Sequence, residues 1–112
     1  MRRGELWWAS LRSPTGSDPG YRRPVLIVQV NEFTDSRIGT VICAAVTRNE
    51  RLAAAPGNVV LDTRQAGLRG KSVINVSQIA TVDKAVLTDR IGRVSPSTMN
   101  DVEAGLRLAL SL

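Results

Sequence analysis

Two consecutive arginines and a proline stand directly before the most apolar run of the chain. Arg22-Arg23-Pro24 leads into Val25 to Val30, in which only Gln29 is polar. A strand covered on both faces normally begins with turn residues, because a guanidinium beside a dry core is costly to desolvate. A second apolar run, 39–47, ends in Thr47. Fixed positive charge beside a hydroxyl at a sheet edge indicates a phosphate-binding site.

The residue inventory restricts the chemistry that such a site could perform. The chain has no histidine, which excludes histidine-based acid–base catalysis, Ser-His-Asp triads and histidine-ligated metal sites. Its ten carboxylates show no close clustering of the kind that a two-metal nuclease needs. An enzyme built from this chain must therefore use arginine, hydroxyls and at most one or two carboxylates, and we expect no metal and no cofactor.

Composition and charge restrict the class of protein. The 112 residues, 43% hydrophobic and 22% charged, are typical of one folded soluble domain, which we expect to span 1–112. The net charge of +5 favours a polyanionic partner. All but two of the 15 basic residues are arginine, which suits bidentate phosphate recognition and is equally explained by GC-rich codon usage.

Localisation follows from the apolar segments and from cysteine usage. No apolar run approaches the roughly 20 residues needed to span a membrane, and Leu6–Ala9 is too short for a signal peptide. The single cysteine, Cys43, cannot form an internal disulfide and falls inside an expected strand. We therefore expect a cytoplasmic protein without membrane association, in which Cys43 is a small buried core residue.

Short segments with strand character alternate with turn residues along most of the chain. Strands are predicted at 4–11, 25–30, 39–47, 58–61, 72–75, 77–82 and 90–94, and loops at 12–22, 49–57 and 65–70. Ser95 can cap a terminal helix, and Pro96 suits its first position. The stripe expected to pack on the sheet is Met99, Val102, Leu106, Ala109 and Leu110. The pattern predicts a mainly β fold, a small curved sheet or barrel with a C-terminal helix.

Pairing of the second and third strands would bring Arg23 and Thr47 together. If the two strands are antiparallel and residue 30 faces residue 40, Arg23 lies opposite Thr47. Opposed residues point to the same face, with Cβ atoms roughly 4.5–5.5 Å apart. A slip of one residue would send Thr47 to the other face, so the inference depends on this register.

A series of short segments, in order along the chain, resembles the MazF/PemK family of bacterial toxin endoribonucleases. Each segment is weak evidence alone, but the ordered set covers nearly the whole chain and is specific. Asp18 stands where the family usually has glutamate, and Ala80 where it often has arginine. The segments are Arg3-Gly4-Glu5-Leu6-Trp7, Gly16-Ser17-Asp18, Arg22-Arg23-Pro24-Val25-Leu26, Ala44-Ala45-Val46-Thr47, Gly67-Leu68, Ser72-Val73-Ile74, Gln78-Ile79, Thr81-Val82-Asp83-Lys84 and Ile91-Gly92-Arg93-Val94.

The resemblance implies an SH3-like twisted barrel of the MazF/CcdB type that acts as the toxin of a toxin–antitoxin pair. Such a toxin is a homodimer, cleaves single-stranded RNA (mRNA) at short sequences without metal, and is inhibited by a MazE-type antitoxin. The family's arginine before proline falls on Arg23, and its catalytic threonine falls on Thr47. The residues expected to contact RNA are Ser17, Asp18, Arg22, Arg48 and Gln78.

The implied chemistry fits the residue inventory. The 2′-OH of RNA would attack the adjacent phosphodiester and leave a 2′,3′-cyclic phosphate and a 5′-hydroxyl. Arg23 would stabilise the charge that develops on the phosphoryl oxygens, and Thr47 would hold a phosphate oxygen or orient the nucleophile. Arginine is a poor base at its usual pKa, which leaves Asp18 or a water for that role.

Two other functions are compatible with the same fold. A CcdB-like gyrase poison would act by binding a protein, but the Leu-Ser-Leu end of this chain lacks the tryptophan expected there. A non-catalytic RNA-binding barrel would bind RNA in a salt-dependent way and leave it intact. Trp7 and Trp8 are candidates for base stacking, and we expect at least one of them in the core or in a dimer contact.

Overall fold

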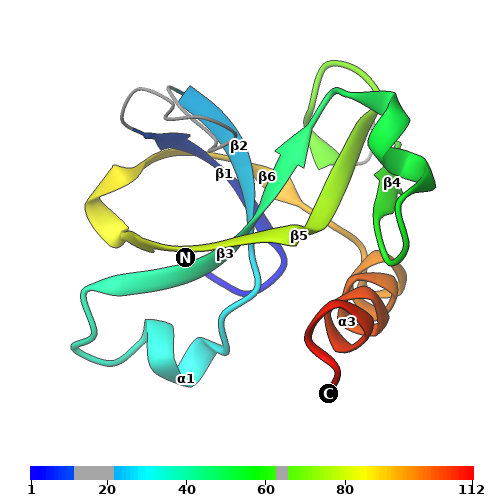
Figure 1. Cartoon of the computed structure of the whole chain (residues 1–112). Coiled ribbons are helices and arrows are strands. Elements are labelled where there is room, and N and C mark those ends of the chain that lie inside the picture. The colour runs from blue at the N-terminus through cyan, green and yellow to red at the C-terminus, as the bar shows by residue number, and fades with distance from the viewer. Residues whose placement is uncertain (12–21, 63–65) are drawn as a thin grey trace.

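Antiparallel strands form one strongly curled sheet of six strands in the order β4-β5-β3-β2-β1-β6 (Figure 1). The computed structural model describes residues 1–11, 22–62 and 66–112. In these ranges no helix has the length and apolarity that a membrane span requires. The predicted mainly β fold with a C-terminal helix is confirmed. The strands are β1 (Glu5–Ser10), β2 (Arg22–Ile27), β3 (Thr40–Thr47), β4 (Val59–Leu61), β5 (Ser72–Asp83) and β6 (Leu87–Arg93).

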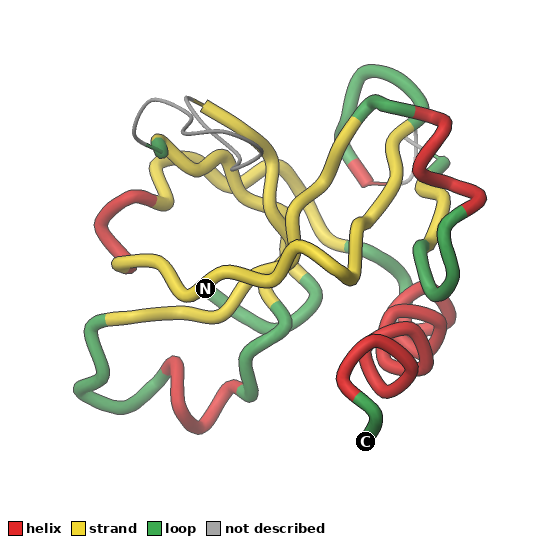
Figure 2. The backbone as a smooth tube through the Cα atoms, viewed as in Figure 1, coloured by secondary structure: helices red, strands yellow, loops and turns green. Residues whose placement is uncertain are grey.

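Helical segments lie in connections between the strands and in the C-terminal part of the chain (Figure 2). α1 (Asn31–Thr34) joins β2 to β3, η1 (Glu50–Ala54) follows β3, η2 (Lys84–Val86) joins β5 to β6, and α3 (Pro96–Leu110) follows β6. The predicted loop 49–57 therefore contains a short 3-10 helix. Asn49 caps this helix by accepting a hydrogen bond from the backbone N–H of Arg51.

β2 ends three residues earlier than predicted, at Ile27. The backbone N–H groups of Val28 and Gln29 both donate to the carbonyl of Ile42, at 3.1 and 3.2 Å, and this shared acceptor interrupts the ladder. The buried amide of Gln29 then donates to the hydroxyl of Thr34 in α1, at 3.1 Å. The single polar residue of the apolar run thus marks the point where the chain leaves the sheet.

Alternate residues of the central strands build two cores, one on each face of the sheet. The core that includes Val102 of α3 also contains Leu6, Leu26, Val28, Ala44 and Val46. The core on the other face contains Ala9, Val25, Ile27, Val41, Cys43 and Leu87. Cys43 is 1% exposed, as predicted, and burial raises the pKa of its thiol to about 12. Its thiolate is therefore not populated at neutral pH.

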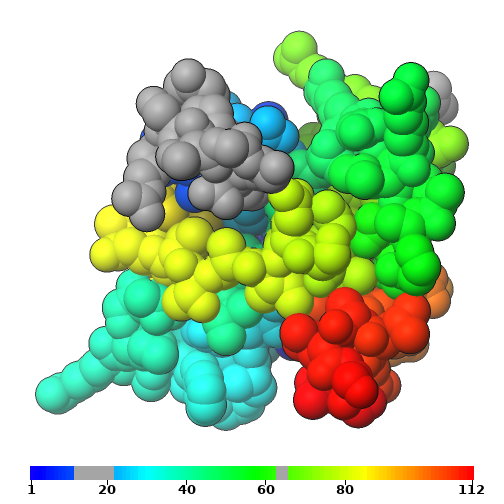
Figure 3. All heavy atoms as spheres, viewed as in Figure 1, coloured from blue at the N-terminus to red at the C-terminus, as the bar shows by residue number. Residues whose placement is uncertain are grey.

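Only the first part of the predicted stripe on α3 packs against the sheet. The predicted cap at Ser95 and the proline at the start of the helix are confirmed. α3 contacts β4 and β5. The residues of its last turn, red in Figure 3, are exposed at the surface, so the prediction was wrong there. The buried or half-buried residues of the stripe are Met99, Val102 and Leu106, and the exposed ones are Ala109 and Leu110.

α3 approaches the loop before β4 at Gly105, where backbone meets backbone. A β-carbon at position 105 would lie 3.0 Å from the carbonyl carbon of Gly57 and 3.1 Å from Cγ1 of Val76, with the Gly57 oxygen closer still. Gly57 has a φ of +81°, a conformation that side chains disfavour. Glycine at both positions lets the helix lie against the loop.

β5 contains an irregularity of three residues where it passes β3. Ala44 pairs with Ile79 and Ala45 pairs with Asn75, so the ladder between these strands omits 76–78. The sequence predicts two strands, 72–75 and 77–82, whereas the structure has one bent strand. Such bulges bend a strand and re-aim its side chains.

Asparagine side chains replace the ladder hydrogen bonds that the excursion at 76–78 loses. The N–H of Val76 donates to Oδ1 of Asn58 at 2.9 Å, and the N–H of Ser77 donates to Oδ1 of Asn75 at 3.2 Å. Val76 is fully buried, whereas Ser77 is exposed and Gln78 is half-buried. The excursion is therefore anchored at its first residue and presents the next two.

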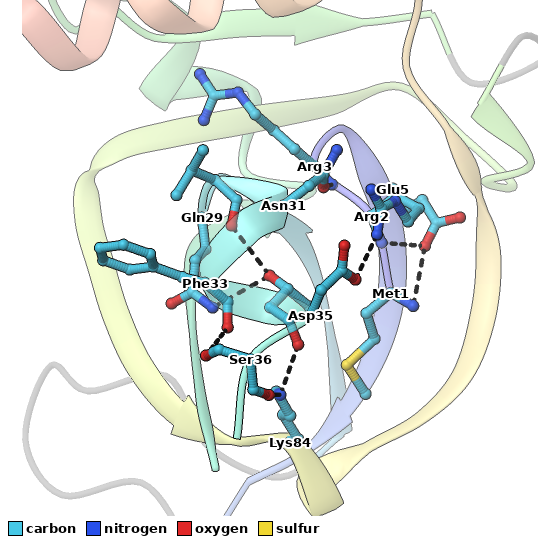
Figure 4. Close-up of polar contacts among 12 residues, drawn as sticks. Met1, Arg2, Arg3, Glu5, Gln29, Asn31, Phe33, Asp35, Ser36 and Lys84 are labelled. Carbon is cyan, nitrogen blue, oxygen red and sulfur yellow. Dashed lines mark hydrogen bonds and ion pairs between the residues drawn. The ribbon is translucent and has the colours of Figure 1, made fainter. Parts of the chain in front are cut away.

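Polar contacts tie the N-terminus to the α1 segment, at the end of β2 away from Arg22 and Arg23 (Figure 4). Nη1 of Arg2 lies 2.6 Å from Oδ1 of Asp35, and the N–H of Arg3 donates to Oδ1 of Asn31 at 2.7 Å. These contacts fasten the start of the chain to the connection between β2 and β3.

Glu5 is a buried carboxylate with several partners at the start of β1. Its Oε1 accepts hydrogen bonds from the N–H of Arg2 (2.7 Å) and the indole of Trp7 (3.1 Å), and its Oε2 lies 2.9 Å from Nε of Arg90. Burial by itself would raise the pKa of Glu5, but these partners together lower it. A carboxyl with a lowered pKa stabilises the fold above its unfolded pKa and loses this contribution as the pH falls.

We expect Glu5→Gln to weaken the dependence of Tm on pH in the acidic range. Wild-type Tm should fall as the pH drops from about 5 to about 3, through the usual glutamate pKa of about 4.3. The variant should have a lower Tm at pH 7 and a weaker dependence on pH below 5, as thermal melts at several pH values will measure. Asp101→Asn, which removes an exposed carboxylate of α3, is the matched control. If Tm depended on pH below 5 equally steeply in Glu5→Gln and Asp101→Asn, Glu5 would not be the source of the acid sensitivity.

Candidate active site

The register of β2 and β3 puts Arg23 and Thr47 on the same face of the sheet. Leu26 pairs with Ala44 and Val25 pairs with Ala45, which is the alignment that follows from residue 30 facing residue 40. The predicted register is therefore confirmed in the paired part of the ladder. Arg23 and Thr47 are each two residues beyond Val25 and Ala45, so their side chains leave the sheet on that same face.

Both side chains line one cavity of about 520 Å³ at the end of the β2–β3 ladder. The cavity takes its walls from the start of β2, the end of β3 and the loop before β5. Its described lining residues are Trp8, Arg22, Arg23, Pro24, Val46, Thr47, Arg48, Gly67, Leu68, Arg69 and Ser72. A volume of this size accommodates a nucleotide-sized ligand.

The hydroxyl of Thr47 is oriented by the backbone that follows it. Oγ1 accepts a hydrogen bond from the N–H of Asn49 at 3.1 Å. Because this bond uses a lone pair of the oxygen, the O–H proton stays available for donation. Thr47 can therefore donate a hydrogen bond to an anionic oxygen in the cavity.

Three arginines line the same cavity as this hydroxyl. Arg23 and Arg48 are exposed and lie in the cavity wall, where they are joined by Arg69 from the loop before β5. Arginine matches the geometry of a phosphate with paired N–H donors. The sequence analysis did not single out Arg69, although a basic residue flanked by Gly67-Leu68 and Gly70 marks a loop that can approach a ligand closely.

Arg69 is positioned by a close contact between two distant segments. A β-carbon at Gly67 would lie 2.6 Å from the carbonyl oxygen of Ile91, and one at Gly92 would collide with the carbonyl of Ala66. The glycines thus let the loop rest directly on β6. Two of the short motifs in the sequence, Gly67-Leu68 and the segment from Ile91, meet at this contact.

Arg22 of the cavity wall has partners on two other strands. Its Nη2 lies 2.8 Å from Oδ2 of Asp89 on β6, and its guanidinium carbon lies 4.5 Å from the ring centroid of Trp8 on β1. The aspartate offsets its charge and the indole covers one side of it. Arg22 thus lines the cavity, as expected, with its guanidinium paired and partly covered.

A second cavity of about 290 Å³ adjoins the first and shares Arg23 and Pro24 with it. Apolar residues of β2 and β3 form much of its wall, and the excursion of β5 brings Ser77 and Gln78 to it. Oε1 of Gln78 accepts a hydrogen bond from Nδ2 of Asn75 at 3.2 Å. An apolar pocket with an amide and a hydroxyl at its wall suits a nucleobase.

Residues 2–110 match the family described as PemK-like, MazF-like toxin of type II toxin-antitoxin system. The chain belongs to this family. It is 48% identical over 112 residues to Endoribonuclease MazF2 of Mycobacterium bovis, with 100% of this chain and 98% of that protein covered. It is 36% identical over 112 residues to Endoribonuclease EndoA of Bacillus subtilis, with 100% and 96% covered. A solved mycobacterial endoribonuclease in complex with its cognate antitoxin has a TM-score of 0.82 and 28% identity, with 100% and 96% covered.

These matches confirm the resemblance seen in the sequence and the MazF type of fold. Of the seven residues expected at the toxin's site, five line the two cavities: Arg22, Arg23, Thr47 and Arg48 the larger, and Arg23 and Gln78 the smaller. Ser17 and Asp18 lie outside the described residues. In the described part of the toxin, no group of three or more His, Cys, Asp or Glu side chains is arranged to hold a metal ion.

Proposed function

We propose that this endoribonuclease toxin cleaves single-stranded RNA, chiefly mRNA, at the rim that bears Arg23 and Thr47. The observation that supports the proposal most strongly is that both side chains leave one face of the sheet and line one cavity. Arginines from separate segments, Arg48 and Arg69, line the same cavity and can bind the flanking phosphates. The similarity to curated endoribonucleases agrees with this reaction.

In the proposed reaction the nucleophile belongs to the substrate. The 2′-OH attacks the neighbouring phosphorus, the bond to the 5′ oxygen of the next nucleotide breaks, and a 2′,3′-cyclic phosphate and a 5′-hydroxyl remain. Arg23 donates two N–H bonds to the phosphoryl oxygens as their charge grows, and Thr47 donates its O–H to one of them. No step requires a metal ion.

The proton of the 2′-OH requires an acceptor. The described residues that line the two cavities include no aspartate or glutamate, and the chain has no histidine. Asp18, outside the described residues, or a water bound at the rim accepts this proton. A water or the protonated Asp18 then supplies a proton to the departing 5′ oxygen.

We further propose that the active toxin is a cytoplasmic homodimer inhibited by a MazE-type antitoxin. A solved relative is recorded in complex with its cognate antitoxin. The net charge of +5 and the arginines of the larger cavity suit an acidic antitoxin segment that competes with RNA.

A substrate with a single 2′-deoxy nucleotide tests the proposed reaction. The purified toxin is incubated with a long RNA, the cut site is mapped, and the nucleotide on its 5′ side is replaced by its deoxy form in a short oligonucleotide. We expect the all-RNA oligonucleotide to be cut in the presence of EDTA and to yield a 5′-hydroxyl fragment, and we expect the deoxy oligonucleotide to stay intact.

Two results would overturn the reaction. Cleavage of the deoxy substrate at a similar rate would remove the 2′-OH from the mechanism. Salt-dependent binding without any cleavage would favour the non-catalytic RNA-binding barrel. A deoxy oligonucleotide that binds but is not cut also serves as a ligand for affinity measurements.

A further inference from the structure

Trp8, Arg22 and Asp89 form a connected group across three neighbouring strands. Trp8 of β1 pairs with Asp89 of β6 on one side and with Pro24 of β2 on the other. Arg22 is two residues before Pro24 and reaches both side chains, at 4.5 Å from the Trp8 ring centroid and 2.8 Å from the Asp89 carboxylate. The group thus fixes the guanidinium at both its face and its edge.

This group lies on the opposite face of β2 from Arg23. Arg22 and Pro24 alternate with Arg23 along the strand, so their side chains point to opposite faces. Nevertheless, Trp8, Arg22, Arg23 and Thr47 all line the larger cavity. The cavity therefore wraps around the open end of the ladder and receives side chains from both faces of the sheet.

The two tryptophans of β1 have different surroundings. Trp7 packs against the core that contains Val25 and Cys43 and donates its indole N–H to Glu5. Trp8 is half-buried and, among the described residues, is not one of the side chains that pack on either core. Its ring instead supports Arg22 in the cavity wall. Core packing therefore explains Trp7 but not Trp8.

Charge distinguishes Arg22 from a phosphate ligand. Asp89 offsets part of the charge of Arg22, and Arg48 and Arg69 supply positive charge to the same cavity. The guanidinium of Arg22 is still a flat group, and it lies over the indole of Trp8. Guanidinium groups and aromatic rings are the surfaces on which unpaired bases stack in proteins that bind single strands.

We propose that the Trp8–Arg22–Asp89 group is a stacking platform for a base that neighbours the scissile phosphate. RNA crosses the rim with its reacting phosphate at Arg23 and Thr47 on one face, and the adjacent base rests on Arg22 on the other. Arg22 and Trp8 contact the RNA, and Asp89 is a positioning residue that holds the guanidinium. The inference rests on the proposed function, because it assumes that the cavity binds RNA.

An abasic scan of the substrate, carried out in parallel on the wild type and variants, tests this platform. Single abasic nucleotides are placed on either side of the mapped cut site, and kcat and KM are measured for each oligonucleotide. In the wild type we expect one flanking position at which loss of the base lowers kcat/KM by roughly 5- to 150-fold, the range typical of base stacking. In Arg22→Ala and Trp8→Leu that penalty should shrink to about 2-fold or less, while penalties at other positions persist.

More conservative variants are less disruptive to the fold and distinguish the roles of Trp8, Arg22 and Asp89. Trp8→Phe keeps an aromatic ring and should keep most of the position-specific penalty. Asp89→Asn releases the guanidinium and should reduce the penalty without abolishing it. Arg2→Ala and Asp35→Asn are matched controls, since they break an exposed Arg–Asp pair that lines neither cavity.

Salt dependence distinguishes a base contact from a phosphate contact. With the uncleavable deoxy oligonucleotide as ligand, removal of a phosphate contact should lower the slope of log Kd against log salt by about 0.7. We expect this change for Arg48→Gln and a smaller one for Arg22→Gln.

Specific results would overturn the platform without touching the proposed function. A full change in salt slope for Arg22→Gln, or an abasic penalty that stays the same in Arg22→Ala and Trp8→Leu, would reject it while the wild type still cuts RNA. The platform would also be rejected if no flanking abasic nucleotide lowered kcat/KM of the wild type. A wild type that cuts no RNA would instead reject the proposed function.

Discussion

Replacing Arg23 by alanine is expected to lower the rate of RNA cleavage by about 10²–10³-fold or more while leaving the fold intact. One preorganised donor to a developing anion contributes roughly this factor, and the guanidinium offers two donors. Arg23 is exposed at the start of β2, so alanine there removes no core contact. Single-turnover cleavage of the mapped oligonucleotide measures the loss, and circular dichroism with a thermal melt checks the fold.

Two companion variants make this result specific. Arg23→Lys keeps the charge but not the paired donors, and its rate should lie between those of the wild type and the alanine variant. Thr47→Val keeps the shape of the strand residue and removes the O–H, so it should also slow the chemical step. An Arg23→Ala protein that cuts RNA at close to the wild-type rate would remove Arg23 from the mechanism.

Replacing Gly105 by alanine is expected to be the most destabilising of these substitutions. Alanine is favoured over glycine in a helix by about 1 kcal/mol, so helix propensity alone predicts a gain. Against this, the new methyl group would press on the Gly57 carbonyl and lie 3.1 Å from Val76 Cγ1. The backbone carbonyl cannot rotate away, and overpacking of this kind costs typically 1–3 kcal/mol or more. We expect a net fall in Tm of roughly 5–15 °C, measured by thermal melts.

Gly39→Ala is the matched control for this substitution. A β-carbon at position 39 would have no heavy atom within 4 Å. The chain there should accept alanine with a change in Tm of a few degrees at most. If Gly105→Ala were as stable as Gly39→Ala, α3 would not depend on the close contact with Gly57.

The sequence predicts the part of the site that depends on local pattern. The apolar runs predict the strands β2 and β3, and the assumed alignment of residue 30 with residue 40, which the structure has, places Arg23 and Thr47 on one face. The buried Cys43 and the capped start of α3 follow from equally local rules. These features need only strand alternation, turn residues and a cap, all of which are visible within a few positions.

The remaining parts depend on contacts between segments that are distant along the chain. The single bent β5 is stabilised by Asn58, and the ion pair of Arg22 with Asp89 requires β6 to pair with β1. Neither contact produces a periodic pattern in the sequence. For this reason the sequence predicts two strands, 72–75 and 77–82, where the structure has the single strand β5, and it gives no indication of the role of Asp89. The stripe on α3 fails at Ala109 and Leu110 for the same reason, since the end of the sheet is a tertiary property.

The excursion of β5 takes Ser77 and Gln78 out of the ladder with β3 and places them in the wall of the smaller cavity. Val76 anchors the departure, and β5 pairs with β3 again from Ile79, in a register shifted by three residues, so neither Ser77 nor Gln78 forms a pair in this ladder. If the smaller cavity binds a base of the RNA, we expect substitutions at these two positions to change the cut sequence while Arg23 and Thr47 stay in place. These two positions are therefore the ones to diversify first in an engineered RNA cutter built on this fold.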